Sequence, residues 1–70
     1  MKNKLSYYMA VNHMSDADMA KKLNYTPMAI YHYRHGRTLP NVIIALKIAD
    51  ILGVRVEEIW RLEENEVDYG

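Results

Sequence analysis

The fold is decided by one stretch of the chain, SDADMAKKLNYTPMAIYHYRHG, which runs from Ser15 to Gly36. This stretch predicts two short helices joined by a tight turn. Ser15 is a good N-cap for the first helix, and Asp18, three residues later, completes a capping box. Asn24 tolerates the left-handed backbone that stops a helix. Such a pair of helices serves mainly to present its second helix to a groove, usually of DNA.

The second helix of the pair begins and ends at residues that suit those positions. Thr26 is a good N-cap, and Pro27 follows at the first helical position, where its missing N–H costs nothing. Gly36 favours the left-handed turn that closes the helix. Ile30 and Tyr33 are expected to face the core. Helical spacing places four other side chains on the opposite side: Met28, Tyr31, His32 and His35.

A solvated helix face is usually built from Lys and Glu, whereas this one carries Met, Tyr and two His side chains. We therefore interpret it as a surface that reads a partner molecule. The alternative is a group of surface aromatic residues without a role in binding, which small proteins also carry.

The net charge of zero conceals a strong asymmetry along the chain. Residues 1–47 hold seven basic and two acidic side chains, a net charge of +5, and residues 48–70 hold two basic and seven acidic ones, a net charge of −5. The basic part includes the predicted pair of helices, as expected of a surface that binds a polyanion. Residues 63–70 are interpreted as an acidic, solvated tail.

Seventy residues are enough for one domain, which we place at residues 1–62. A chain of this length buries only about 60% of its unfolded surface, so helix packing or a partner subunit must supply further stability. The absence of Cys excludes disulfides and Cys-ligated zinc. No segment reads as a membrane span or as a signal peptide, and a cytoplasmic protein is therefore expected.

Two further helices are expected at the ends of the domain. The first covers about residues 4–12, and apolar spacing turns three of its side chains inward: Leu5, Tyr8 and Met9. The last covers about residues 56–60 and places its apolar side chains against the core: Val56, Ile59 and Trp60.

A longer helix is predicted over residues 42–52, between an N-cap at Asn41 and a closing Gly53. Its inner stripe is expected to be Val42, Ala45, Ala49 and Leu52. Four other side chains leave it apolar most of the way round: Ile43, Ile44, Ile48 and Ile51. Such a helix is either wholly buried or offers a second apolar face, and a small protein favours the second face. The interface of a homodimer is therefore expected at Ile44, Ile51, Trp60 and Leu62.

With five helices in this order, the chain resembles the Cro/C1-type (XRE-like) helix-turn-helix family of phage and bacterial transcriptional repressors. The resemblance covers about residues 4–60 and rests on the joint spacing of Ala20, Leu23, Ile30, Gly36 and Pro40. It rests equally on the run ALKIADILGVRVEEIW, from Ala45 to Trp60. It implies an all-α, five-helix, lambda-repressor-like domain in a bacterial cell or encoded by a phage. The implied function is a sequence-specific regulator of transcription, a repressor.

The resemblance also implies a homodimer on double-stranded DNA, with two recognition helices in successive major grooves about 34 Å apart on an inverted repeat. The base-reading positions of the family fall here on Pro27, Met28, Tyr31 and His32. Its phosphate-contact positions fall on Asp16, Arg37, Thr38 and the backbone N–H of Asn41. Other basic side chains near the reading helix extend the expected backbone contacts: Lys21, Lys22, Arg34 and His35.

Three residues depart from the pattern of the family. Gln is usual where this chain has Asp16, and a carboxylate there would be repelled by a phosphate. Pro27 has no donor and offers a base only an apolar contact. An Arg in the first helix often pairs with a Glu in the third, but Met9 and Arg34 stand at these positions. Arg34 is thus left to reach the DNA backbone, Asp16 or Asp18.

Other classes of function find less support. His32 and His35 lack a third ligand and make a weak metal site at most, so neither a metal nor another cofactor is expected. A chain this short has little room for a catalytic pocket and carries no Gly-rich phosphate loop, so no enzyme and no small-molecule substrate are expected.

The strongest rival is a protein-interaction module of the same fold, which docks on another regulator without reading DNA. It would use the apolar side of helix 42–52 and the acidic tail. The lack of Gln, Asn and Lys at the reading positions favours this rival, whereas the basic residues around them favour DNA.

Overall fold

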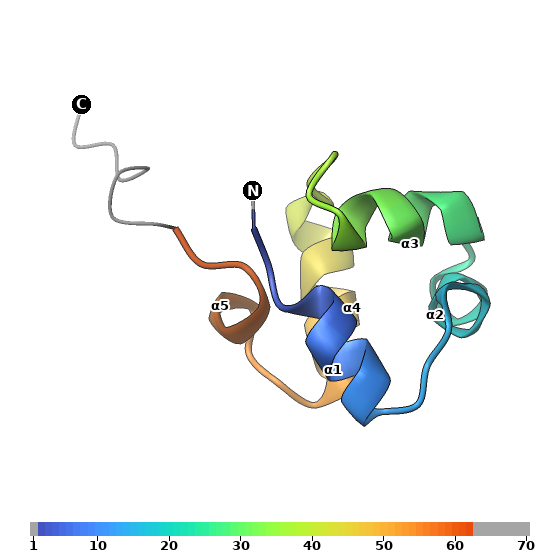
Figure 1. The fold of residues 1–70 in the computed structure, drawn as a ribbon, viewed down its shortest axis with the longest axis horizontal. Helices are drawn as coiled ribbons and strands as arrows, with labels where there is room; N and C mark the ends of the chain where they lie inside the picture. Colours follow the sequence, from blue (N-terminus) through green and yellow to red (C-terminus); the bar gives the residue numbers. More distant parts are fainter. Residues whose placement is uncertain (1, 63–70) are drawn as a thin grey trace.

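The computed structural model describes residues 2–62, and this part of the chain is built from five helices (Figure 1). They are α1 (Leu5–Val11), α2 (Asp16–Leu23), α3 (Pro27–Arg34), α4 (Val42–Leu52) and α5 (Val56–Ile59). The predicted all-α, five-helix fold is confirmed, and each predicted helix differs from the observed one by at most one residue at either end. None of the helices in this part of the chain is long and apolar enough to span a bilayer. The expected acidic tail, residues 63–70, lies outside the described residues.

Local sequence chemistry sets the helix ends. The side chains of Ser15, Thr26 and Asn41 accept hydrogen bonds at the starts of α2, α3 and α4, and Ser15 with Asp18 forms the expected capping box. Four helices end next to a residue with a left-handed backbone, namely His13, Asn24, Gly36 and Gly53. In each case the N–H of the following residue donates to a carbonyl five residues back, which satisfies the helix end.

The core lies where α4 crosses behind α1 and α3 (Figure 1). It comprises Leu5, Met9, Met19, Ala20, Leu23, Ile30, Ile44, Ile48, Ala49, Leu52 and Ile59. The expected inner stripe of α4 is therefore only half right. Val42 is 74% exposed, whereas Ile44 and Ile48 are buried. Since α4 is apolar on nearly every side, its periodicity did not identify the inward face, and packing against α2 and α5 decides it.

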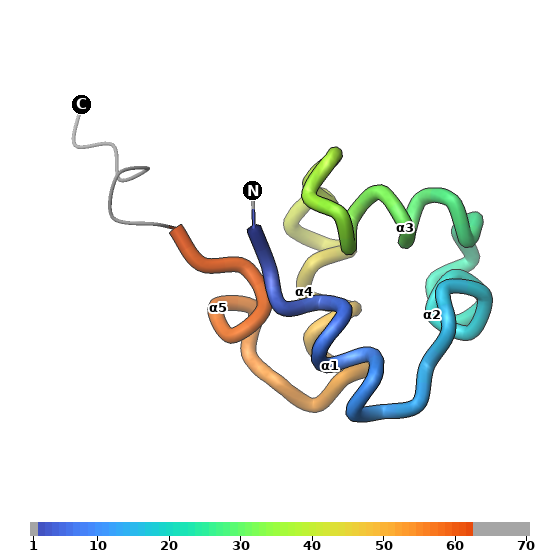
Figure 2. Tube along the Cα trace, viewed as in Figure 1, coloured from blue at the N-terminus to red at the C-terminus, as the bar shows by residue number. Residues whose placement is uncertain are grey.

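The N-terminal segment, residues 2–4, is tied to elements far along the chain. The N–H of Lys4 donates to the carbonyl of Ile59 (2.9 Å), and Asn3 forms an isolated antiparallel bridge with Trp60. The amide Nδ2 of Asn3 donates to the carbonyl of Tyr33 at the end of α3 (2.9 Å). The trace in Figure 2 shows this segment passing between α5 and α3. Nothing in the sequence predicted this anchor.

Candidate nucleic-acid interface

Helix α3, for which a reading role is predicted, is held by its inner side, as the helical spacing indicated. Ile30 is fully buried, and Tyr33 packs against the core, where burial raises the pKa of its hydroxyl. On the outer side, Met28 is 60% exposed and His35 is exposed. Tyr31 and His32, predicted to share this side, are only half-buried rather than free. The exposed part of α3 is therefore narrower than the stripe that spacing alone predicts.

Tyr31 is the centre of a cluster of rings and cations. Its ring lies 4.2 Å from the ring of His35 and 5.8 Å from that of His32, measured between centroids. The guanidinium carbons of Arg37 and Arg34 lie 5.5 and 5.8 Å from the Tyr31 centroid, within the range of cation–π attraction. These contacts limit the freedom of Tyr31 and gather positive charge around the end of α3.

His32 presents only part of its imidazole. Its Nδ1 atom is buried and has no hydrogen-bond partner within residues 2–62. A base contact from His32 would therefore have to come from Nε2, which fixes the tautomer that could donate to a base.

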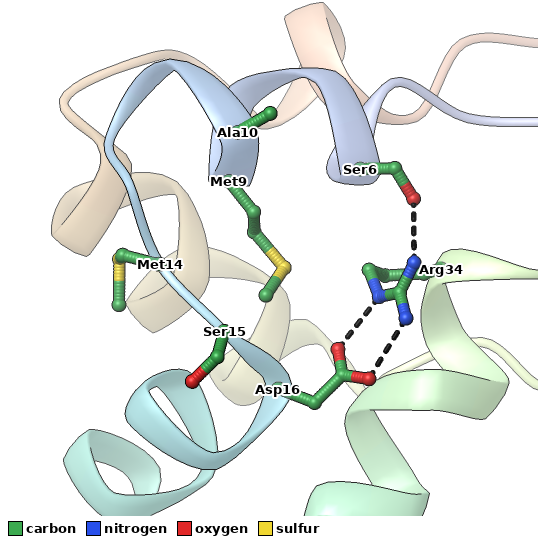
Figure 3. A pocket seen from close by; sticks show the side chains of 7 residues that line it. All are labelled: Ser6, Met9, Ala10, Met14, Ser15, Asp16 and Arg34. Atoms are coloured by element: carbon green, nitrogen blue, oxygen red, sulfur yellow. Dashed lines mark hydrogen bonds and ion pairs between the residues drawn. The ribbon is translucent and has the colours of Figure 1, made fainter.

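Arg34 is held in an ion pair instead of standing free. Its Nε and Nη2 atoms donate to the two carboxylate oxygens of Asp16 (2.6 and 2.8 Å), and Nη1 donates to Oγ of Ser6 (3.1 Å). Figure 3 shows the guanidinium between α1 and the start of α2. Of the two carboxylates that the sequence left open, Asp16 and Asp18, the structure shows Asp16 as the partner. The hydrogen bonds from Arg34 to this carboxylate raise the pKa of the guanidinium.

This pair has a consequence for Asp16, the position at which a bare carboxylate would repel a phosphate. Because Arg34 is bound to both oxygens, the negative charge of Asp16 is compensated at the start of α2. The pair also joins α2 to α3, and the hydrogen bond from Arg34 to Ser6 connects both helices to α1. It borders a small hollow of about 240 Å³, lined in part by Met9 and Met14 (Figure 3).

The other residues expected to contact DNA, through its backbone or, for Pro27, through a base, lie on the surface around α3. Lys21 and Lys22 are exposed at the end of α2, Pro27 at the start of α3, and Arg37 and Thr38 in the loop before α4. The Oδ1 atom of Asn41 accepts the N–H of Ile44 (2.9 Å). A phosphate contact at Asn41 would accordingly fall to its backbone N–H, as the family resemblance implies. Tyr25, half-exposed in the turn between α2 and α3, is a neighbour that sequence reasoning missed.

The residues expected at a dimer interface do not form one exposed patch. Ile44 is buried in the core of the monomer, so its assignment to an interface is wrong. Ile51 and Trp60 are half-buried against the core, and only Leu62 is widely exposed, at 64%. The exposed apolar side chains of α4 and of the segments on either side of α4 and α5 are instead Leu39, Val42, Ile43, Leu46 and Leu62. Three of them, Leu39, Val42 and Leu62, line a shallow apolar hollow of about 270 Å³ beside Trp60.

The sequence of this chain is similar to those of known helix-turn-helix proteins. The pattern of the helix-turn-helix family matches residues 12–59, from the end of α1 through α5. An uncharacterised HTH-type transcriptional regulator of Methanocaldococcus jannaschii is 39% identical over 66 residues, 94% of this chain and 100% of that protein. Multiprotein-bridging factor 1c of Arabidopsis thaliana is 35% identical over 43 residues, which are 61% of this chain but 29% of that protein.

A solved structure shares the fold. The crystal structure of a proposed DNA-binding protein from Bacteroides fragilis superposes with a TM-score of 0.76 and covers 83% of this chain and 94% of that one. The two sequences are 16% identical, so the likeness concerns the arrangement of the helices. Within residues 2–62, no three His, Asp or Glu side chains gather as a metal site would require.

Proposed function

The chain belongs to the Cro/C1-type (XRE-like) helix-turn-helix family, and on this premise we propose that it is a sequence-specific, double-stranded DNA-binding regulator of transcription. Its action is repression. Two copies bind an inverted-repeat operator, and each inserts α3 into the major groove.

One observation carries this proposal: exposed cations lie around α3, and the carboxylate of Asp16 is already paired with Arg34. The described residues hold nine basic and five acidic side chains, a net charge of +4. Lys21, Lys22 and Arg37 flank α3, and Arg34 neutralises Asp16. A surface of this kind attracts the phosphate backbone while leaving uncharged side chains for the bases.

The roles of the reading residues follow from their exposure. Met28 packs on a thymine methyl group, and Pro27 adds apolar contact beside it. His32 donates from Nε2 to a guanine O6 or N7 atom. Tyr31, held by its ring neighbours, presents its hydroxyl. Backbone phosphates contact Lys21, Lys22, Arg37, Thr38 and the N–H of Asn41.

The second copy binds through the exposed apolar side chains near α4 and α5. Val42 and Leu62 form this surface with Leu39, and Trp60 borders it. We expect Val42→Asp to abolish self-association in sedimentation equilibrium and to leave the thermal midpoint of the monomer unchanged, because Val42 lies outside the core. A parent chain that stays monomeric at high micromolar concentration, both free and on DNA, would refute the homodimer.

The proposal is tested by selection of binding duplexes from a random library. We expect enrichment of an inverted repeat whose half-sites are one helical turn apart, and affinity that falls steeply with salt. Expression of a reporter gene downstream of the selected site should then decrease when the protein is produced. Selection without any enriched sequence, or a reporter that is activated, would contradict the proposal.

A second candidate is a protein-interaction module that docks on another regulator. The exposed apolar side chains of α4 support it, as does the similarity to a relative named as a multiprotein-bridging factor. The selection experiment separates the two functions, because a module of this kind enriches no duplex.

A further inference from the structure

A cleft between the N-terminal segment and the end of α3 gathers hydrogen-bond donors. It measures about 460 Å³ and is lined by Lys2, Asn3, Arg34 and His35. None of these lining side chains is a carboxylate. Lys2 belongs to a segment to which neither the family resemblance nor the sequence assigned a role.

Every polar side chain in this cleft retains a donor. Arg34 has five N–H groups, of which its bonds to Asp16 and Ser6 use three, so two remain. Asn3 accepts the N–H of Leu5 through Oδ1 and donates one N–H to the carbonyl of Tyr33. These two bonds fix the orientation of its amide and leave a second N–H of Nδ2. Lys2 adds an ammonium group from the N-terminal segment.

Capping of α3 does not explain these donors. Cations near the end of a helix often complement its last carbonyls. Here the carbonyls of Tyr31, His32 and Tyr33 already accept the backbone N–H groups of His35, Arg37 and Gly36, respectively, and Asn3 also donates to that of Tyr33. Two carboxylates of the described residues lie close by, and both already accept hydrogen bonds. Asp16 accepts from Arg34, and Glu58, in the neighbouring hollow shared by Lys2 and Arg61, accepts the N–H of Arg55 (2.7 Å).

The cleft is continuous with the reading surface. His35 lines the cleft, and its ring also contacts that of Tyr31 in a tilted arrangement, with 4.2 Å between the centroids. In Figure 1 the first residues rise beside the end of α3, toward the same edge of the molecule as the loop between α3 and α4. A duplex that contacts α3 and Arg37 would bring its backbone toward this cleft.

We propose that the cleft of Lys2, Asn3, Arg34 and His35 binds a phosphate group of the DNA backbone beside the footprint of α3. This inference rests on the proposed function. The same donors fit a free phosphate ion, and the experiment therefore separates the two sources. A lining with two cationic side chains, a free amide N–H and no carboxylate favours an oxyanion over a cation.

The first arm measures the affinity of the parent and of Lys2→Ala for a duplex over a range of salt concentrations. Lys2 is exposed and outside the core, so the variant keeps the fold. We expect the slope of log affinity against log salt to fall by about 0.9 in Lys2→Ala, the amount for one phosphate. Lys47→Ala removes the same charge from the exposed side of α4 and should keep the parental slope.

The second arm titrates inorganic phosphate into the parent without DNA and follows the backbone amide resonances. Weak shifts at residues 2, 3 and 35 that vanish in Lys2→Ala are expected. If the parent binds DNA but Lys2→Ala keeps the parental slope, the inference is overturned, and phosphate shifts would then assign the cleft to a free anion. If the parent binds no duplex, the proposed function fails, and the backbone assignment of the cleft fails with it.

Discussion

Two neighbouring helices, α3 and α4, are held in the fold by opposite means. α4 buries Ile44, Ile48, Ala49 and Leu52 and has no side-chain ion pair in the described chain. α3 buries only Ile30 fully, and polar contacts fix the rest of it: Asp16 and Ser6 hold Arg34, and Asn3 holds the carbonyl of Tyr33. Non-directional burial supplies stability around α4, whereas directional bonds set how α3 is presented. Stability and binding should therefore respond to different substitutions.

The largest expected effect is on the α4 side. Ile48 is fully buried, and Ile48→Ala should cost about 2–5 kcal/mol of the free energy of unfolding through lost burial and the remaining cavity. Denaturant unfolding measures this loss. Ile43→Ala, an equal truncation at a 65% exposed site of the same helix, serves as the control and should stay within about 0.5 kcal/mol of the parent. Equal losses at both sites would show that α4 is not held by this face.

A smaller loss of stability is expected on the α3 side, with a larger effect on DNA. Asp16 and Arg34 are each about a quarter exposed, so Asp16→Ala should cost no more than about 1 kcal/mol. Removal of a negative charge should by itself tighten DNA binding. The variant also loses the link between α3 and α2, and we therefore expect the ratio of its specific to its non-specific affinity to fall.

Asp50→Ala is the matched control for this test, since it removes one exposed acidic charge from α4. It should leave the ratio of affinities unchanged. An Asp16→Ala variant that binds its selected duplex more tightly, with full specificity, would mean that the ion pair does not position α3.

The smallest effect concerns the capping box of α2 and depends on pH. The pKa of Asp18 lies below its usual value of 3.8, chiefly because its carboxylate accepts the backbone N–H of Ser15. A lowered pKa in the folded state means that ionised Asp18 stabilises the fold above about pH 4. This stabilisation is lost as pH falls through the lowered pKa.

Thermal unfolding between about pH 2 and pH 6 tests this expectation. Asp18→Asn should show a shallower fall of its midpoint with acid than the parent does. If the thermal midpoints of the two proteins fall identically with acid, Asp18 does not contribute to the pH dependence of stability.

The same contrast between local and distant contacts decides what the sequence could predict. The caps at Ser15, Thr26 and Asn41 and the left-handed ends at Asn24 and Gly53 are properties of neighbouring residues, and each was predicted correctly. The left-handed His13 was missed, because His is tolerated in that conformation without being a signal for it.

Contacts between distant residues were beyond sequence reasoning. The partner of Arg34 could only be narrowed to three groups, and the anchor from Asn3 to Tyr33 spans thirty positions. The inward face of α4 was predicted only half correctly for another reason. In a helix that is apolar on nearly every side, the spacing of apolar residues does not show which face is buried. The outward side of α3 was predicted from helical spacing, but the half-burial of Tyr31 and His32 required the packed structure.

The reading role of α3 is tested most directly by affinities for a selected duplex and for each of its single base-pair variants, measured with the parent, Met28→Ala and Arg37→Ala. We expect Met28→Ala to lose about 1–3 kcal/mol of discrimination at one base pair and none elsewhere. Arg37→Ala should weaken binding to all duplexes about equally and lower the salt slope by about 0.9. Unchanged preferences at every base pair in Met28→Ala, with a uniform loss of affinity in both variants, would contradict base reading by the exposed face of α3.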